Sequence, residues 1–67
     1  MIQPHQQRVI DEKTELDDKR GKLRDFIELS PIFPNLPDAE RILLVRQESC
    51  MAEYTEILTE RIAAFHP

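Results

Sequence analysis

Arg61 is the residue of this sequence whose chemistry is hardest to explain by helix packing alone. It belongs to a row of seven residues that recur every three or four positions, namely Leu44, Gln47, Met51, Tyr54, Leu58, Arg61 and Phe65. This spacing is typical of an α-helix that packs one face against a neighbour. A guanidinium on such a contact stripe needs a partner, because burying it unpaired is costly. Two partners fit its chemistry, a carboxylate across an interface or a planar anion such as phosphate.

Gln47 poses the same question, because its amide also stands on the contact stripe. We expect Gln47 to fix the register of packing or to form a hydrogen bond across an interface. The remaining members of the stripe are the expected packing residues: Leu44, Met51, Tyr54, Leu58 and Phe65.

Most of the other cations lie in the first half of the chain. Within residues 8–24 they are Arg8, Lys13, Lys19, Arg20, Lys22 and Arg24. Acidic residues alternate with them, which is typical of a solvated helix face crossed by ion pairs. Glu15–Lys19 and Asp18–Lys22 have the favoured order for such pairs, with the acid four residues before the base.

Nothing in the sequence indicates catalytic or metal chemistry. Cys50, the only cysteine, lies on an apolar row with no histidine near it in sequence, so we expect a buried structural thiol. Asp11, Glu12 and Glu15 follow His5, but their spacing repeats no known metal-ligand pattern. We therefore expect neither an enzyme nor a metal, and no cofactor.

Two helical segments must position these residues. Glycine occurs once, and no strand-like alternation persists. The first helix is expected at about 5–29, with apolar Val9, Leu16 and Leu23 in a strict heptad. Three prolines interrupt residues 30–37, and a second helix is expected at about 37–64. The fold class is therefore all-α, an antiparallel two-helix hairpin in a single domain, with Ile32, Phe33 and Leu36 of the proline-rich turn folding back onto the helices.

A second apolar row on the later helix predicts self-association. Leu43, Cys50, Ile57 and Ala64 form this row, and a partner helix with one heptad stripe covers only one of the two rows. A chain of 67 residues buries little surface alone and has no second cysteine for a disulfide. We expect a symmetric homo-oligomer.

Charge and hydropathy limit the partners and the compartment. A net charge of −4 argues against sequence-blind binding of DNA or RNA, although it does not exclude a small phosphate-bearing ligand. No run of about 18 apolar residues is present, and the first residues lack the pattern of a signal peptide. We expect no membrane association and a cytoplasmic location.

The order of residues in both halves resembles one family of small phage proteins. The first half carries His5-Gln-Gln-Arg-Val-Ile-Asp-Glu-Lys-Thr-Glu-Leu-Asp-Asp-Lys19, followed by Lys22-Leu23 and Phe26-Ile27. The second half carries Leu36-Pro37, Glu40-Arg41, Leu43-Leu44, Gln47, Met51, Tyr54, Leu58 and Glu60-Arg61-Ile62-Ala63-Ala64-Phe65. Over about 60 of the 67 residues, this order is similar to that of the anti-CBASS and Thoeris anti-defence nucleotide sponges.

The resemblance implies a non-enzymatic binder that assembles as a hexamer of helical hairpins and sequesters cyclic di- and trinucleotide immune signals. By position, His5 resembles a ring that stacks on a base, Lys19 or Lys22 a phosphate-binding lysine, and Arg61 an arginine of a separate trinucleotide pocket. With Arg8, the candidate ligand-binding residues are His5, Arg8, Lys19, Lys22 and Arg61. Arg20 departs from the family pattern, which usually has an apolar residue there, and His5 replaces what is often tyrosine.

The leading hypothesis is thus a phage-encoded sponge that blocks CBASS-type defence inside an infected bacterium. The alternative is a structural or regulatory hairpin that binds a protein helix through its surplus apolar row. An enzyme that degrades the signal is disfavoured, because the sequence lacks the metal and nucleophile constellations for it.

Overall fold

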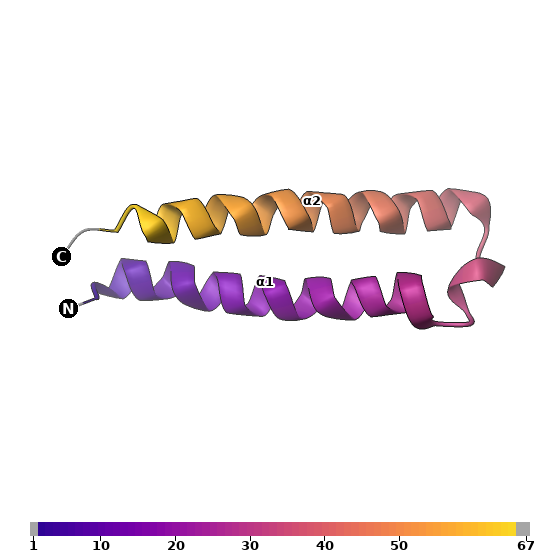
Figure 1. The fold of residues 1–67 in the computed structure, drawn as a ribbon, viewed down its shortest axis with the longest axis horizontal. Coiled ribbons are helices and arrows are strands. Elements are labelled where there is room, and N and C mark those ends of the chain that lie inside the picture. The colour runs from indigo at the N-terminus through magenta and orange to yellow at the C-terminus, as the bar shows by residue number, and fades with distance from the viewer. Residues whose placement is uncertain (1, 66–67) are drawn as a thin grey trace.

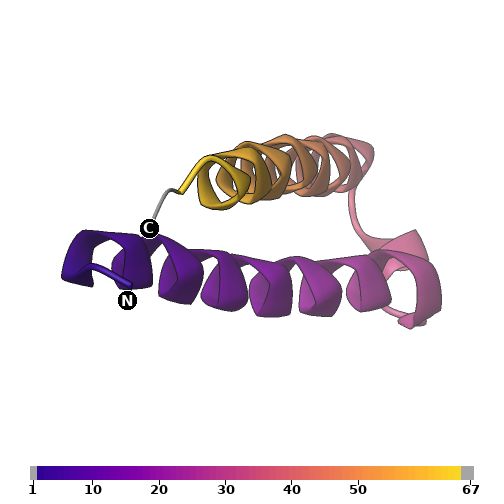
Figure 2. The ribbon, with the colours of Figure 1, turned by 60° about the vertical axis from the view of Figure 1, so that its left-hand side comes forward.

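A computed structural model describes residues 2–65 of the chain. Helix α1 spans Pro4–Leu29, a short 3₁₀ helix η1 spans Phe33–Asn35, and helix α2 spans Asp38–Ala63. The two long helices run antiparallel, so that both ends of the described chain lie at one end of a rod and the turn lies at the other (Figure 1). The helices stay stacked when the rod is turned (Figure 2), and the rod measures 50 × 15 × 14 Å. The fold is an all-α antiparallel hairpin, as the sequence predicts.

Local sequence explains where both helices start. At the start of α1, the backbone N–H of Gln3 donates to Oε1 of Gln6 at 2.9 Å, and Pro4 has no N–H to leave unsatisfied. Pro37 precedes α2, whose first turn carries Asp38 and Glu40. Their negative charges complement the positive end of the helix dipole.

The turn packs onto the hairpin through one aromatic contact. Phe33 is buried, and its ring centroid lies 6.1 Å from that of Phe26 in α1. Leu36 is half-buried, but Ile32 is 59% exposed, so the prediction that Ile32 also packs inward is wrong. Ile32 is the residue that leads into η1, and its backbone N–H is held by Oγ of Ser30 at 3.1 Å, which leaves the side chain outside.

The core between the helices is a single thin layer. Val9 and Leu16 of α1 are buried against Leu58 of α2, which is 0% exposed. Met51, Ile62 and Phe65 pack around these three side chains. The predicted apolar heptad of α1 therefore faces α2, with Leu23 half-buried at its end.

The contact stripe of α2 differs from the predicted one at every second position. The half-buried and buried row runs Leu44, Glu48, Met51, Thr55, Leu58, Ile62 and Phe65. Gln47 and Arg61 are exposed and lie outside the contact with α1. Tyr54 is 42% exposed, so the prediction that Tyr54 packs on this stripe is wrong. A step of three residues from Leu44 and a step of four residues both stay on one face of a helix. The observed row is hard to recognise in the sequence because two of its members, Glu48 and Thr55, are polar.

Glu48 and Thr55 can lie at the interface between the two helices because α1 supplies hydrogen-bond partners for both. Nε of Arg20 donates to Oε1 of Glu48 at 2.9 Å, and both side chains are mostly covered. The Thr55 hydroxyl donates to Asp17, whose other oxygen accepts from Nζ of Lys13 at 2.6 Å. The lysine and threonine hydrogen bonds lower the pKa of the Asp17 carboxyl below its ordinary value of 3.8.

This pKa shift predicts an acid-sensitive contribution to stability. A carboxylate whose pKa is lower in the folded state stabilises the fold above its unfolded-state pKa, and the contribution disappears as the pH falls through the folded-state pKa. The free energy of unfolding of Thr55→Val should therefore be lower than that of the parent at neutral pH. This gap between the two free energies should narrow below pH 3.8. Urea unfolding followed by circular dichroism across this range measures it. Thr14→Val is the control, because the Thr14 hydroxyl bonds only within its own helix; a gap that stays constant with pH contradicts the prediction.

Candidate functional site

Two surfaces lie on either side of the contact between the helices. Each consists of residues that are adjacent in sequence to residues facing the other helix. The inward row of α1 is at least half-buried throughout: Gln6, Val9, Lys13, Leu16, Arg20, Leu23 and Ile27. We call flank A the residues that directly precede the two inward rows. In α1 these are His5, Arg8, Glu12, Glu15, Lys19, Lys22 and Phe26, and in α2 they are Leu43, Gln47, Cys50, Tyr54, Ile57, Arg61 and Ala64.

Both halves of flank A lie on the same side of the hairpin. One residue turns the direction of a side chain by about 100° around a helix. The two helices run in opposite directions, and their contact faces also point in opposite directions. These two reversals cancel, so the same displacement along the sequence leads to the same side of the rod.

All five candidate ligand-binding residues belong to flank A, and all five are exposed: His5, Arg8, Lys19, Lys22 and Arg61. The contacts Asp17–Thr55 and Arg20–Glu48 fix the alignment of the helices. Counted from these contacts at about 1.5 Å per residue, Arg8 and Arg61 lie within about one helical turn of the same level. Two arginines from different helices thus share the end of the rod opposite the turn (Figure 1).

The lysines form a separate group on flank A. Lys19 lies eleven residues beyond Arg8, or about 16 Å along α1. The ammonium of Lys22 lies 3.2 Å from the Asp18 carboxylate, an exposed pair of the predicted kind. The predicted Glu15–Lys19 pair does not form in the described chain. One hairpin therefore presents an arginine group and a lysine group but does not bring them together.

Most cations of flank A are free to bind an anion. The ion pairs between described residues involve none of Arg8, Lys19 and Arg61. Arg61 is exposed and also lies in the last turn of α2, where positive charge is favoured by the helix dipole. Its fold-stabilising role is small, which leaves its guanidinium available to a ligand or to another chain.

The apolar members of flank A are not covered by the hairpin. Leu43 and Ile57 are 53% and 45% exposed, and the row Leu43, Cys50, Ile57 and Ala64 lies outside the contact with α1, as the sequence predicts. Cys50 is exposed, so the expectation of a buried thiol is wrong. Its row is apolar, but that row borders the contact instead of forming it.

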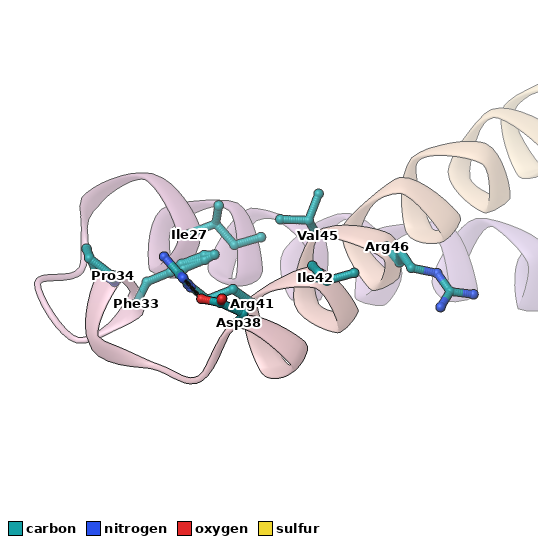
Figure 3. Close-up of a pocket in the computed structure, with 8 residues that line it drawn as sticks. All are labelled: Ile27, Phe33, Pro34, Asp38, Arg41, Ile42, Val45 and Arg46. Carbon is teal, nitrogen blue, oxygen red and sulfur yellow. Dashed lines mark hydrogen bonds and ion pairs between the residues drawn. The ribbon is translucent and has the colours of Figure 1, made fainter.

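The sequence does not predict a hollow that lies near the turn. Its volume is about 690 Å³, and it is lined by Ile27, Phe33, Pro34, Asp38, Arg41, Ile42, Val45 and Arg46 (Figure 3). A side-chain oxygen of Asp38 accepts a hydrogen bond from Arg41, whose Nε is buried without a hydrogen-bond partner. Arg41 and Arg46 are spaced like charged residues on many exposed helices, so the sequence does not indicate a hollow beside them. The hollow forms because the turn packs against the helices.

Within residues 2–65, no three potential metal-ligating side chains gather into a cluster. The same part of the chain contains no helix long and apolar enough to cross a membrane.

The fold and flank A define a small helical-hairpin protein that presents cations and apolar side chains together on one side. The chain belongs to the Sequestin family, whose model matches residues 3–64. This match spans both helices and the turn. Comparison with curated proteins gives no match, and comparison with solved structures gives none either.

Proposed function

We propose that this protein is a phage-encoded, non-catalytic sponge that binds cyclic di- or trinucleotides and so blocks CBASS-type defence in the cytoplasm of an infected bacterium. Membership of the Sequestin family over residues 3–64 is the observation that carries the proposal, because it suggests sequestration of cyclic nucleotides by a phage protein. The arrangement of flank A supports it.

The chemistry of flank A suits such a ligand. A cyclic dinucleotide carries two phosphate charges and two purine faces. The guanidinium groups of Arg8 and Arg61 offer fork-like donors to phosphate oxygens, and the imidazole of His5, one turn before Arg8, offers a ring for stacking. Stacking contributes about 1–3 kcal/mol per base in single-stranded nucleic acids. Binding of this kind needs no nucleophile and no metal.

A homo-oligomer, proposed to be a hexamer by resemblance, completes the site. The arginine and lysine groups of one hairpin are about 16 Å apart along the rod, so a second copy that runs antiparallel along flank A brings its lysine group towards the arginine group of the first. The exposed apolar row of flank A supplies the surface that such a contact would bury. A ligand held between copies would then meet Arg8 and Arg61 from one hairpin and Lys19 or Lys22 from the other.

Calorimetric titration of the assembled protein with a panel of cyclic di- and trinucleotides tests the proposal. Submicromolar binding, with intact ligand recovered after heat denaturation, is the expected result. Recovery of hydrolysed ligand would instead indicate an enzyme. The absence of binding to every member of the panel would refute the proposal.

The exposed Leu43 and Ile57 favour one alternative, a hairpin that binds a helix of another protein through the apolar row. Charge substitution on this row tests whether nucleotide binding depends on contact between copies through the row. Ile57→Asp should abolish self-association and nucleotide binding together if the ligand lies between copies. A protein that remains fully assembled and still binds nucleotides after this change would place the ligand elsewhere.

A further inference from the structure

The hollow near the turn, which we call the turn hollow, has the composition of a small-molecule binding site. Its volume of about 690 Å³ lies within the range of about 300–1,000 Å³ that is usual for ligand pockets. It lies at the turn end of the rod, opposite the end that carries Arg8 and Arg61. Most of its walls are apolar, and they come from α1, the turn and α2: Ile27, Phe33, Pro34, Ile42 and Val45.

The hairpin does not cover these apolar walls by itself. Phe33 is buried, but Ile42 is 59% exposed and Val45 is 46% exposed. An apolar body placed against these side chains would remove them from water, which is favourable. The turn hollow therefore suits a ligand whose larger part is apolar.

Arg41 has hydrogen-bond donors to spare in the turn hollow. It lies beside Phe33 (Figure 3), and one of its terminal nitrogens donates to Asp38. Its Nε is buried and has no hydrogen-bond partner, and an unpaired buried N–H is costly. A guanidinium can donate from Nε and a terminal nitrogen together to both oxygens of one carboxylate. An acceptor inside the hollow would therefore satisfy a group that the hairpin leaves unpaired.

The charges around the turn hollow leave one positive charge in excess. Arg41 and Arg46 contribute two cations and Asp38 one anion. The Asp38 side chain is 86% exposed, so it meets Arg41 from the solvent side. Arg46 lies at the end of the hollow away from the turn (Figure 3) and belongs to no ion pair between described residues. In a chain whose net charge is −4, this local excess favours an occupant with a single negative charge.

We propose that the turn hollow binds a small amphipathic carboxylate. Its carboxylate group accepts hydrogen bonds from Arg41, and its aromatic or branched apolar body packs against Ile27, Ile42 and Val45. A nucleotide fits less well, because its hydroxyl and phosphate groups would face these apolar walls. The site is separate from flank A and from the binding of cyclic nucleotides proposed above.

Naphthalene-2-carboxylate is a suitable probe, and naphthalene-2-methanol is its uncharged counterpart. Each is titrated into the full chain labelled at the methyl groups of isoleucine and valine, and the methyl signals are followed by NMR. The signals of Ile27, Ile42 and Val45 should shift and saturate with the carboxylate at a dissociation constant below about 1 mM. The signals of Ile10 and Ile57, which do not line the hollow, should stay in place. The alcohol should bind at least about 10-fold more weakly, because it lacks the charge-assisted contact.

Arg41→Met tests the contact assigned to Arg41, since methionine keeps an unbranched apolar stem and removes the cation. It should weaken binding of the carboxylate by about 10-fold and leave binding of the alcohol almost unchanged, so that the preference for the carboxylate disappears. A residue that only supported the shape of the hollow would weaken both probes alike. Arg61→Met is the matched control, because Arg61 is an exposed arginine at the other end of the same helix. It should leave both affinities within about twofold of the parent.

Val45→Asp is a second variant that does not touch the Asp38–Arg41 pair. Val45 is half exposed, so the hairpin should stay folded, and the added negative charge should weaken binding of the carboxylate more than that of the alcohol. Three results would each overturn the proposal: no saturable shift of the three methyl signals, equal affinities of the parent for both probes, or equal losses of both probes in Arg41→Met. Methyl signals that move on dilution of the protein alone, without any binding of the carboxylate, would assign the hollow to a second copy and would also overturn it.

Titration with cyclic di- and trinucleotides separates this proposal from the proposed function. These nucleotides should leave the methyl signals of Ile27, Ile42 and Val45 in place and should not displace the carboxylate. Displacement of the carboxylate by a nucleotide would overturn the proposal of a separate site. Binding of the carboxylate without binding of any nucleotide would support this proposal and refute the proposed function.

Discussion

Replacement of Arg61 by alanine is expected to weaken binding of at least one class of cyclic nucleotide by about 10- to 100-fold. The loss of one charge-assisted hydrogen-bonded contact, at about 1.5–3 kcal/mol, corresponds to this range. The hairpin itself should remain folded, because the Arg61 side chain is exposed and contributes to no ion pair between described residues. Titration calorimetry with cyclic di- and trinucleotides gives the affinity, and circular dichroism gives the helix content.

Arg24→Ala is the matched control for this change. Arg24 is an exposed arginine of α1 that lies outside flank A and pairs with Glu28, at 3.8 Å between nitrogen and oxygen. Its replacement should leave the affinity within about twofold of the parent. If Arg61→Ala instead dissociates into unfolded monomers, Arg61 is an assembly residue, and the phosphate role assigned to it is wrong.

Replacement of Leu58 by alanine is expected to have the largest effect on folding. Leu58 is 0% exposed and contacts the buried residues Val9 and Leu16 across the interface. Truncation of a buried leucine costs about 2–5 kcal/mol, while a domain of this size has a total stability of about 3–10 kcal/mol. The variant should therefore lose a large share of its stability, and its melting temperature should fall well below that of the parent in thermal unfolding followed by circular dichroism.

Ile57→Ala provides the neighbouring control. Ile57 is 45% exposed and stands on flank A, so its truncation should lower the melting temperature much less than Leu58→Ala does at the same protein concentration. Similar losses for both variants would mean that assembly through flank A contributes as much to stability as the core of the hairpin. A small loss for Leu58→Ala would contradict the thin core described above.

The sequence predicts the hairpin well because its helices are long, their breaks are marked by proline, and Val9, Leu16 and Leu58 follow a plain apolar spacing. The side of α2 that faces α1 was harder to predict. Tyr54 is more apolar than Thr55, so a pattern of hydrophobicity alone selects the wrong neighbour. Only the partners on α1, Asp17 for Thr55 and Arg20 for Glu48, explain why polar residues occupy the interface.

The same shift of one position changes how the candidate site is understood. Arg61 is not an unpaired charge inside the contact between the helices. It stands on flank A, and the alignment of the helices brings it level with Arg8, a relation between two residues far apart in sequence. The hollow beside Phe33 and the orphaned Nε of Arg41 depend on the path of the turn, and no local pattern indicates them.

The arrangement of inward rows between two side surfaces also determines where the chain can tolerate a change in length. Insertion of one residue within α2 rotates everything beyond it by about 100°, which moves residues of flank A into inward positions and turns the core residues towards the side of the rod opposite flank A. Arg61 would then point at the core in place of Ile62. A change in length within residues 30–37 does not rotate one part of a helix relative to another. Natural length variation in relatives of this chain should therefore occur in the turn and be absent from both helices.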